Sequence, residues 1–91
     1  NMGEACTAAN RFLVHRSVAE DFASRLAQRM GALVVGRGTE DGVQVGPLVN
    51  AKGREKVTTL VRDALDKGAA VRIGADPGDG PGHFYPPTVL T

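Results

Sequence analysis

The sequence predicts an α/β fold, because two helical patterns alternate with short apolar segments typical of strands. The first of these segments is Arg11–His15, whose continuous apolar run suits a strand covered on both faces, as in a parallel sheet. Two more strand-like segments, Ala70–Gly74 and Phe84–Thr91, follow the helical regions. Pro86 and Pro87 place the last one at a sheet edge or a strand start. The expected order is β-α-loop-α-β with a further terminal strand.

The first helix is expected to start at Ser17, because Ser17 and Glu20 have the S-x-x-E spacing of a capping box. Apolar side chains then recur every three or four residues. They are Val18, Phe22, Leu26, Met30 and Leu33. Such a stripe predicts packing on a sheet, with Glu20 facing water. Gly31 should weaken the end of this helix, and Gly36 and Gly38 should end it.

A polar loop, Arg37–Pro47, separates the first helix from a second one. The second helix is expected over about Ala51–Lys67, with Asn50 as its N-cap and Gly68 as its C-terminal stop. Asp76–Gly82, which is rich in Gly and Pro, is expected to be a turn or flexible loop before the terminal strand.

Composition excludes several classes of function. The 91 residues carry 11 Lys and Arg against 10 Asp and Glu, a net charge of +1, and only 4% aromatic residues, which argues against a nucleic-acid-binding surface. The longest apolar stretch, Ala32–Val35, is far short of a membrane span. One cysteine and the absence of a basic and apolar leader within the 91 residues fit a cytoplasmic protein, and a start without Met reads as an excised segment.

Cys6 is the only thiol and the only candidate nucleophile. A single cysteine in a soluble chain is usually a small buried hydrophobe. Gly3 permits a tight turn before Cys6, and the small residues Thr7–Ala9 follow it. A helical turn beginning near Glu4 would bring backbone amides close to the sulfur and favour the thiolate, although the Glu4 carboxylate opposes this effect. The residues alone leave both a nucleophile and an inert thiol open.

The segment Asn1–Cys6, followed by Arg11, resembles the cysteine signature of the aldehyde dehydrogenase superfamily, N-x-G-[QE]-x-C with an arginine five residues on. Three more landmarks of that family follow in the same order, with the patterns V-G, G-P-L and F-x-x-P-T-V. They lie at Val34–Gly36, Gly46–Leu48 and Phe84–Val89. Within the superfamily, Gly3–Val14 is most similar to bacterial NAD(P)-dependent succinate-semialdehyde dehydrogenases.

The resemblance implies that Cys6 attacks an aldehyde to form a thiohemiacetal, which passes hydride to NAD or NADP and leaves a thioester. It also implies that the oxyanion-stabilising Asn, the general-base Glu and an arginine for the substrate carboxylate lie upstream of Asn1. Glu4 stands where the family usually has Gln and is expected to be structural. Ala8 stands where some relatives carry a second, redox-active cysteine.

Residues 1–91 are therefore expected to be a partial catalytic domain, without the cofactor-binding and oligomerisation parts, and to be inactive alone. The parent enzyme would be a homo-oligomer acting on a small aldehyde. No metal site is expected, since His15, His83 and one cysteine do not make a ligand set. No cofactor-binding residue is assigned, because Gly36–Gly38 ends a helix instead of opening one. The alternative is a stand-alone α/β binding or interaction module with an inert Cys6.

Overall fold

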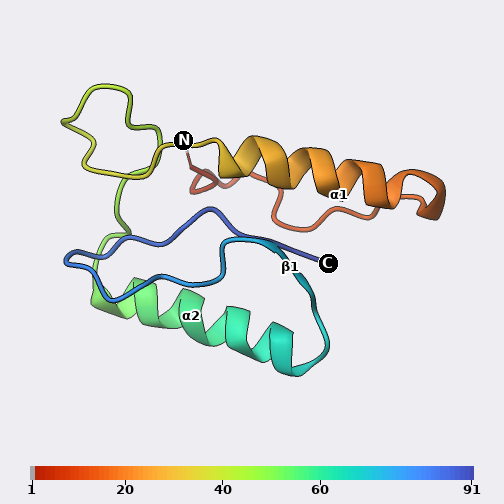
Figure 1. Ribbon diagram of the computed structural model, residues 1–91. Helices are drawn as coiled ribbons and strands as arrows, with labels where there is room; N and C mark the ends of the chain where they lie inside the picture. Colours follow the sequence, from red (N-terminus) through yellow and green to blue (C-terminus); the bar gives the residue numbers. More distant parts are fainter. Residues whose placement is uncertain (1) are drawn as a thin grey trace.

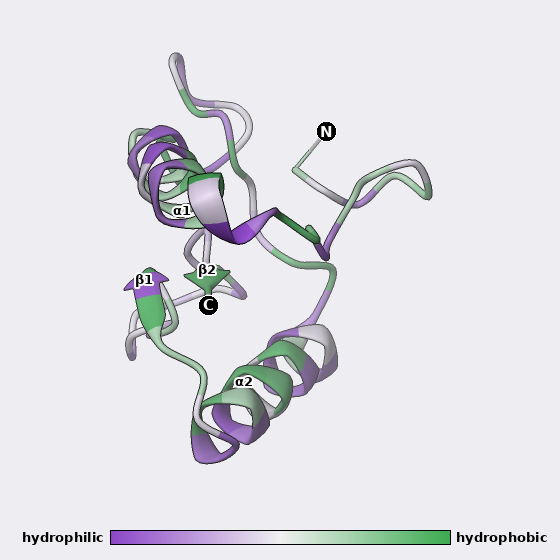
Figure 2. Ribbon diagram, turned by 90° about the vertical axis from the view of Figure 1, so that its right-hand side faces the viewer, coloured by the Kyte–Doolittle hydropathy of each residue, from purple (hydrophilic) through white to green (hydrophobic). Residues whose placement is uncertain are grey.

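The computed structural model describes residues 2–91 and contains two helices and two short strands. Helix α1 spans Arg16–Gly31, α2 spans Ala51–Asp66, β1 spans Val71–Ile73 and β2 spans Val89–Leu90. The strand pair lies between the two helices (Figure 1), and β2 is largely hydrophobic (Figure 2). The predicted α/β class is confirmed.

The two strands pair with each other in the antiparallel direction. Val71 lies opposite Leu90 and Ile73 opposite Val89, so the register shifts by one residue, as in a β-bulge. Beyond the strand ends, Ala70 and Thr91 exchange two backbone hydrogen bonds of 2.7 and 3.0 Å. The strand predicted at Ala70–Gly74 is confirmed as β1, and the strand predicted at Phe84–Thr91 is confirmed only over Val89–Leu90. Each strand is the other's partner.

The expected first strand at Arg11–His15 is wrong. This segment is irregular, and no backbone hydrogen bond joins it to β1 or β2. An apolar run becomes a strand only where another strand is available for pairing, and residues 2–91 offer none at this position. Leu13 in its middle is 96% exposed, so the predicted burial on both faces is also absent within the described part of the chain.

Helix α1 begins earlier and ends earlier than predicted. His15, not Ser17, is the N-cap, and its ring Nδ1 accepts the Ser17 backbone N–H at 3.2 Å. The last helical residue is Gly31, so the predicted end at Gly36 and Gly38 is wrong. A Cβ atom at Gly31 would collide with the side chain of Ile73, so this glycine allows β1 to lie close to the end of α1.

Helix α2 matches its prediction to within one residue. The Asn50 side chain accepts the Gly53 backbone N–H at 2.9 Å, and Lys67 is the C-cap. Gly68 follows with a positive φ of 100°, as expected at a helix C-terminus. The segment between the strands then folds back onto this helix, because Arg54 donates hydrogen bonds to the carbonyls of Pro77 and Gly78.

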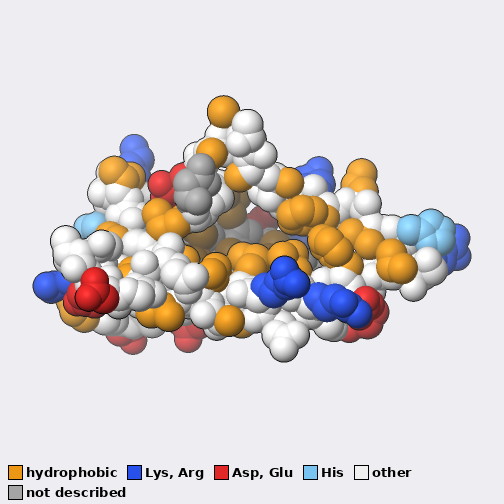
Figure 3. Space-filling view, turned by 90° about the horizontal axis from the view of Figure 1, so that it is seen from above, with side chains coloured by type: hydrophobic (Ala, Val, Ile, Leu, Met, Phe, Trp, Pro, Cys, Tyr) orange, Lys and Arg blue, Asp and Glu red, His pale blue; other side chains and the backbone are white. Residues whose placement is uncertain are grey.

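The buried core is small. Among the described residues, the buried hydrophobic side chains are Ala23, Tyr85 and Val89, each 7–8% exposed. Many large apolar side chains are instead open to solvent, with Val49 at 88% exposed as an example beside Leu13. Hydrophobic side chains gather across the middle of one face of the molecule and surround a hollow (Figure 3). Apolar surface of this extent marks faces that contact other polypeptide.

Candidate functional site

Cys6 lies in a short exposed turn near the beginning of the chain. The Ala8 backbone N–H donates to the Ala5 carbonyl at 2.9 Å, which closes the chain around Cys6. The helical turn expected near Glu4 therefore amounts to a single hydrogen-bonded turn and does not continue as a helix. A single turn supplies far weaker aligned amide dipoles than a helix N-terminus does.

The backbone bends sharply just before this turn. Gly3 has a φ of +79°, and Met2 has a φ of +63°, which is uncommon for a residue with a side chain. The tight turn predicted at Gly3 is confirmed. Asn1, the first residue of the signature, lies outside the described residues.

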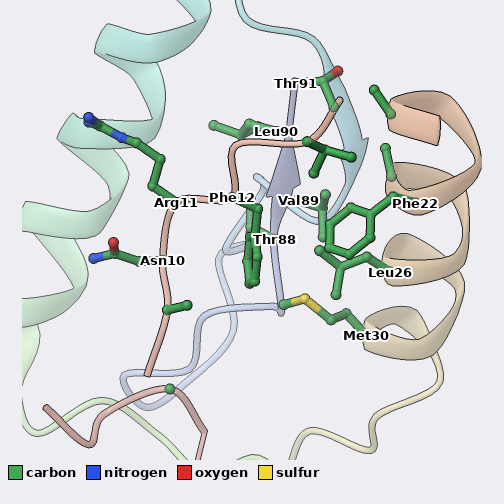
Figure 4. Close-up of a pocket in the computed structure, with 15 residues that line it drawn as sticks. Asn10, Arg11, Phe12, Phe22, Leu26, Met30, Thr88, Val89, Leu90 and Thr91 are labelled. Carbon is green, nitrogen blue, oxygen red and sulfur yellow. The ribbon is translucent and has the colours of Figure 1, made fainter. Parts of the chain in front are cut away.

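No acceptor for the Cys6 backbone N–H is present within residues 2–91. That N–H is therefore available to donate a hydrogen bond to an oxyanion, once a substrate is bound covalently to the sulfur. Glu4 and Arg11 are both exposed. In the described structure Arg11 makes no hydrogen bond or ion pair, and its side chain points away from α1 (Figure 4).

Hydrogen bonds connect the four family landmarks into one network. The Met2 sulfur accepts the Gly46 N–H at 2.9 Å, which joins the cysteine segment to the G-P-L turn. On one side of that turn, Gly36 donates to the Val45 carbonyl at 3.0 Å, within an isolated parallel bridge between Val35 and Val45. On the other side, the Leu48 N–H donates to the His83 carbonyl at 2.9 Å, immediately before the F-x-x-P-T-V segment.

An apolar groove of about 570 Å³ lies beside the site. The segment after Cys6, helix α1 and the last four residues of the chain line it (Figure 4). Phe12 packs against Phe22 there, with ring centroids 5.5 Å apart. Gly3 reaches the groove but Cys6 does not line it. The apolar stripe Val18–Leu33 predicted an apolar face on this helix. No local sequence pattern predicted that Phe12 would pack against that face.

The remaining predicted candidates stay apart from Cys6. The His15 ring caps α1, and the only His83 contact described above uses its backbone carbonyl. Within residues 2–91, no three side chains of the metal-binding types His, Cys, Asp or Glu cluster at one point.

Neither α1 nor α2 has the length and apolar character needed to cross a bilayer.

The whole chain, residues 1–91, matches the aldehyde dehydrogenase family. It is 58% identical over 90 residues to the succinate-semialdehyde dehydrogenase of Paenarthrobacter nicotinovorans, covering 99% of this chain and 20% of that protein. It is 45% identical over 91 residues to the NADP(+) succinate-semialdehyde dehydrogenase of Mycobacterium avium, covering all of this chain and 19% of that protein. The chain thus spans about a fifth of the length of these curated relatives.

Solved structures agree with the sequence relatives. The succinate-semialdehyde dehydrogenase of Burkholderia pseudomallei superposes with a TM-score of 0.91 at 44% identity, covering 98% of this chain and 18% of that one. The lactaldehyde dehydrogenase of Escherichia coli superposes equally well, with a TM-score of 0.91 at 35% identity, covering 99% of this chain and 19% of that one. Sequence, fold and the order of the landmarks lead to one assignment: the chain belongs to the aldehyde dehydrogenase family.

Proposed function

We propose that this chain is part of the catalytic domain of an aldehyde dehydrogenase and supplies its nucleophile, Cys6. Two features of Cys6 carry the proposal. Its thiol is exposed in a turn, and its backbone N–H donates to no acceptor within residues 2–91. A thiolate at this position is accessible to an aldehyde carbon. The same N–H belongs to the residue that carries the sulfur and is available to donate to the oxygen that becomes negatively charged.

The first step follows from these groups. The Cys6 sulfur donates an electron pair to the aldehyde carbon, the C=O π pair moves to the oxygen, and a thiohemiacetal oxyanion forms. The Cys6 backbone N–H donates to that oxygen and lowers the barrier to its formation. Glu4, exposed and in the same short segment, has a structural role in this proposal.

The Gly36–Gly38 segment does not fit a pyrophosphate-binding turn. Gly36 follows the end of α1 and pairs with Val45, so no helix N-terminus opens at this glycine-containing segment to receive a pyrophosphate. In the proposal, NAD or NADP would be the hydride acceptor, and its dinucleotide-binding domain would lie in polypeptide outside these residues. The activity is therefore expected of a longer, homo-oligomeric cytoplasmic enzyme, and the 91 residues alone are expected to be inactive.

Succinate semialdehyde is the proposed substrate, because the relatives at 58% and 45% identity are named for it. A structural neighbour named for lactaldehyde has the same fold at lower identity, so the fold alone does not select between aldehydes. Comparing kcat/KM for succinate semialdehyde, lactaldehyde and an uncharged aliphatic aldehyde tests this choice. A higher value for either rival would contradict it.

The decisive experiment replaces Cys6 by Ser in the longer enzyme that carries this segment. Loss of a catalytic nucleophile lowers kcat by at least about a thousand-fold. Thr7→Ala, which alters the neighbouring exposed side chain and leaves the sulfur, is the matched control and is expected to retain most activity. Full turnover by Cys6→Ser would remove the proposal. Separately, formation of NADH or NADPH by the isolated 91 residues would refute their predicted inactivity.

The alternative function, a binding module with an inert cysteine, is favoured by one observation: Cys6 does not line the groove. Alkylation by iodoacetamide near neutral pH separates the two functions. Because Cys6 is the only cysteine of the chain, any label found on a peptide from this segment reports on Cys6. Rapid labelling in the longer enzyme, blocked by the aldehyde substrate, supports the nucleophile.

A further inference from the structure

One side-chain hydrogen bond joins the first residues of the chain to its centre. The Met2 sulfur accepts the Gly46 backbone N–H at 2.9 Å, across 44 residues of sequence. Within the described residues, no other hydrogen bond joins the segment 2–14 to the remainder of the chain. We propose that Met2 is a positioning residue whose thioether holds the Cys6 turn on the Gly46–Pro47 segment. This inference rests on the proposed role of Cys6 as nucleophile.

The backbone at Met2 supports this role independently of the contact. Met2 has a φ of +63° and Gly3 a φ of +79°, so two consecutive residues adopt the left-handed region. Glycine does so freely, but a residue with a side chain keeps this conformation only where its surroundings hold it. The described structure provides one such holding contact for the Met2 side chain, its bond to Gly46. The hydrogen bond from Gly46 to Met2 therefore stabilises the backbone bend that precedes Cys6.

The other end of the contact is firmly fixed. Val45 uses both its backbone groups, since its carbonyl accepts from Gly36 at 3.0 Å and its N–H donates to Val34 at 3.0 Å. Leu48 is held in turn by the His83 carbonyl at 2.9 Å. Gly46 is thus held in place by the hydrogen bonds of Val45 before it and Leu48 after it. By contrast, one internal hydrogen bond, from Ala8 to Ala5, closes the turn that carries Cys6.

The chemistry of Cys6 depends on where its sulfur stands relative to the substrate carbonyl. A misplacement of about 1 Å lowers the rate of a positioned reaction by up to a hundred-fold. Thioether sulfur is a weak acceptor, so its loss is expected to loosen the turn without unfolding the protein. The expected signature is a slower chemical step with unchanged substrate binding, which a purely structural residue would not produce.

The test uses three variants of the longer enzyme. Met2→Leu keeps an apolar side chain of similar volume and removes the acceptor atom. Met2→Gln restores an acceptor on a side chain of similar length, with the amide oxygen one bond further from the backbone than the thioether sulfur. Met30→Leu makes the same chemical change on α1, away from Gly46, and is the matched control. For each variant, the single-turnover rate of NADH or NADPH formation, KM for the aldehyde and Tm are measured.

Met2→Leu is expected to lower the single-turnover rate about ten-fold at unchanged KM and Tm, Met2→Gln to recover most of the rate, and Met30→Leu to leave it unchanged. A rate within two-fold of the parent in Met2→Leu overturns the proposal, as does an equal loss in Met2→Gln. Should Met2→Leu fail to fold, Met2→Gln decides alone: a near-normal rate supports the proposal and a ten-fold loss overturns it.

Cys6→Ser in the same preparation separates this inference from the proposed function. If Cys6→Ser abolishes turnover while Met2→Leu is normal, Met2 has no positioning role and the proposed function stands. If Cys6→Ser is fully active, the proposed function fails, and the inference about Met2 fails with it.

Discussion

Glu20 and Arg72 form a two-pronged ion pair that fastens α1 to β1. Arg72 Nη1 donates to Glu20 Oε1 at 2.6 Å, and Nη2 donates to Oε2 at 2.7 Å. Arg72 Nε also donates to the Thr91 side-chain hydroxyl at 3.0 Å, next to β2. The hydrogen bonds from Arg72, together with its charge, lower the pKa of the Glu20 carboxyl. One guanidinium group on β1 therefore joins helix α1 to β1 and to the residue that follows β2.

Glu20→Gln is expected to lower the Tm of the 91-residue chain slightly at pH 7 and low salt, because the charged pair is lost. The pair is exposed, so about 1 M NaCl should remove most of the difference. The lowered pKa means that the stabilisation is complete above the ordinary value of 4.5 and is lost as pH falls through the lower folded-state value. Thermal unfolding followed by circular dichroism, at several pH values, measures both effects.

Asp21→Asn is the control for this pair, because Asp21 contacts Arg25 within the same helix at 2.9 Å and joins no second element. Its effect on Tm is expected to be smaller than that of Glu20→Gln. Equal effects would show that the Glu20–Arg72 pair adds nothing beyond a local helix contact.

The start of α1 shows why a local pattern misplaced this helix. Ser17 and Glu20 have capping-box spacing, yet His15 caps the helix and Glu20 pairs with a residue 52 positions away. A sequence rule based on four residues cannot include such a distant partner. Helix α2, by contrast, begins with a purely local cap, and the Asn50 prediction is confirmed.

Asn50→Ala is expected to destabilise the chain by about 1 kcal/mol, because the Gly53 backbone N–H loses its acceptor. Ser17→Ala is the matched control at the other helix. If His15 is the true cap of α1, Ser17→Ala costs clearly less than Asn50→Ala in urea unfolding. A larger loss in Ser17→Ala would restore Ser17 as the cap.

The strand pair shows a second limit of prediction from sequence. The segments predicted as strands, Ala70–Gly74 and Phe84–Thr91, contain both observed strands, but the pairing of these strands depends on the bend between them. Gly74 and Ala75 both have positive φ, of 77° and 73°. Arg11–His15 carries an equally convincing apolar run and stays irregular, because strand formation needs a partner that periodicity cannot reveal. The family signature likewise pointed to Cys6 as a candidate, because the signature is local. The contact from Met2 to Gly46 joins residues far apart in the sequence and is seen only in the structure.

Gly74→Ala tests the bend directly. A Cβ atom at Gly74 would lie 2.6 Å from Thr88 Oγ1 and would also collide with the Pro87 carbonyl, and the φ of +77° is unfavourable for alanine. The expected loss is about 3 kcal/mol or more, since backbone strain adds to the clash. Gly78→Ala is the matched control, with a φ of +63° and no atom near its added Cβ. Similar losses in the two variants would mean that the close approach of Pro87 and Thr88 is unimportant.

Tyr85 holds the same bend from the other side and is one of the three buried hydrophobic residues described. Its hydroxyl donates to the Ala75 carbonyl at 3.2 Å. Burial raises the pKa of the Tyr85 hydroxyl above its ordinary value of 10.0, and the negative charge of Asp76 raises it further, while a hydrogen bond with Thr58 opposes the shift. The folded chain therefore keeps the phenolic proton to higher pH than the unfolded chain does.

This difference predicts how stability changes with pH. Between the unfolded and folded pKa values of Tyr85, unfolding releases a proton, so the free energy of unfolding falls as pH rises above 10.0. Tyr85→Phe is expected to cost about 1 kcal/mol at pH 7, where the bond to Ala75 is lost, and to abolish this part of the alkaline decline. Tyr85 is the only tyrosine, so the ultraviolet absorbance of tyrosinate titrates it directly. A midpoint at or below 10.0 in the folded chain, or an equal alkaline decline in Tyr85→Phe, would mean that the phenol is not buried against Ala75 in solution.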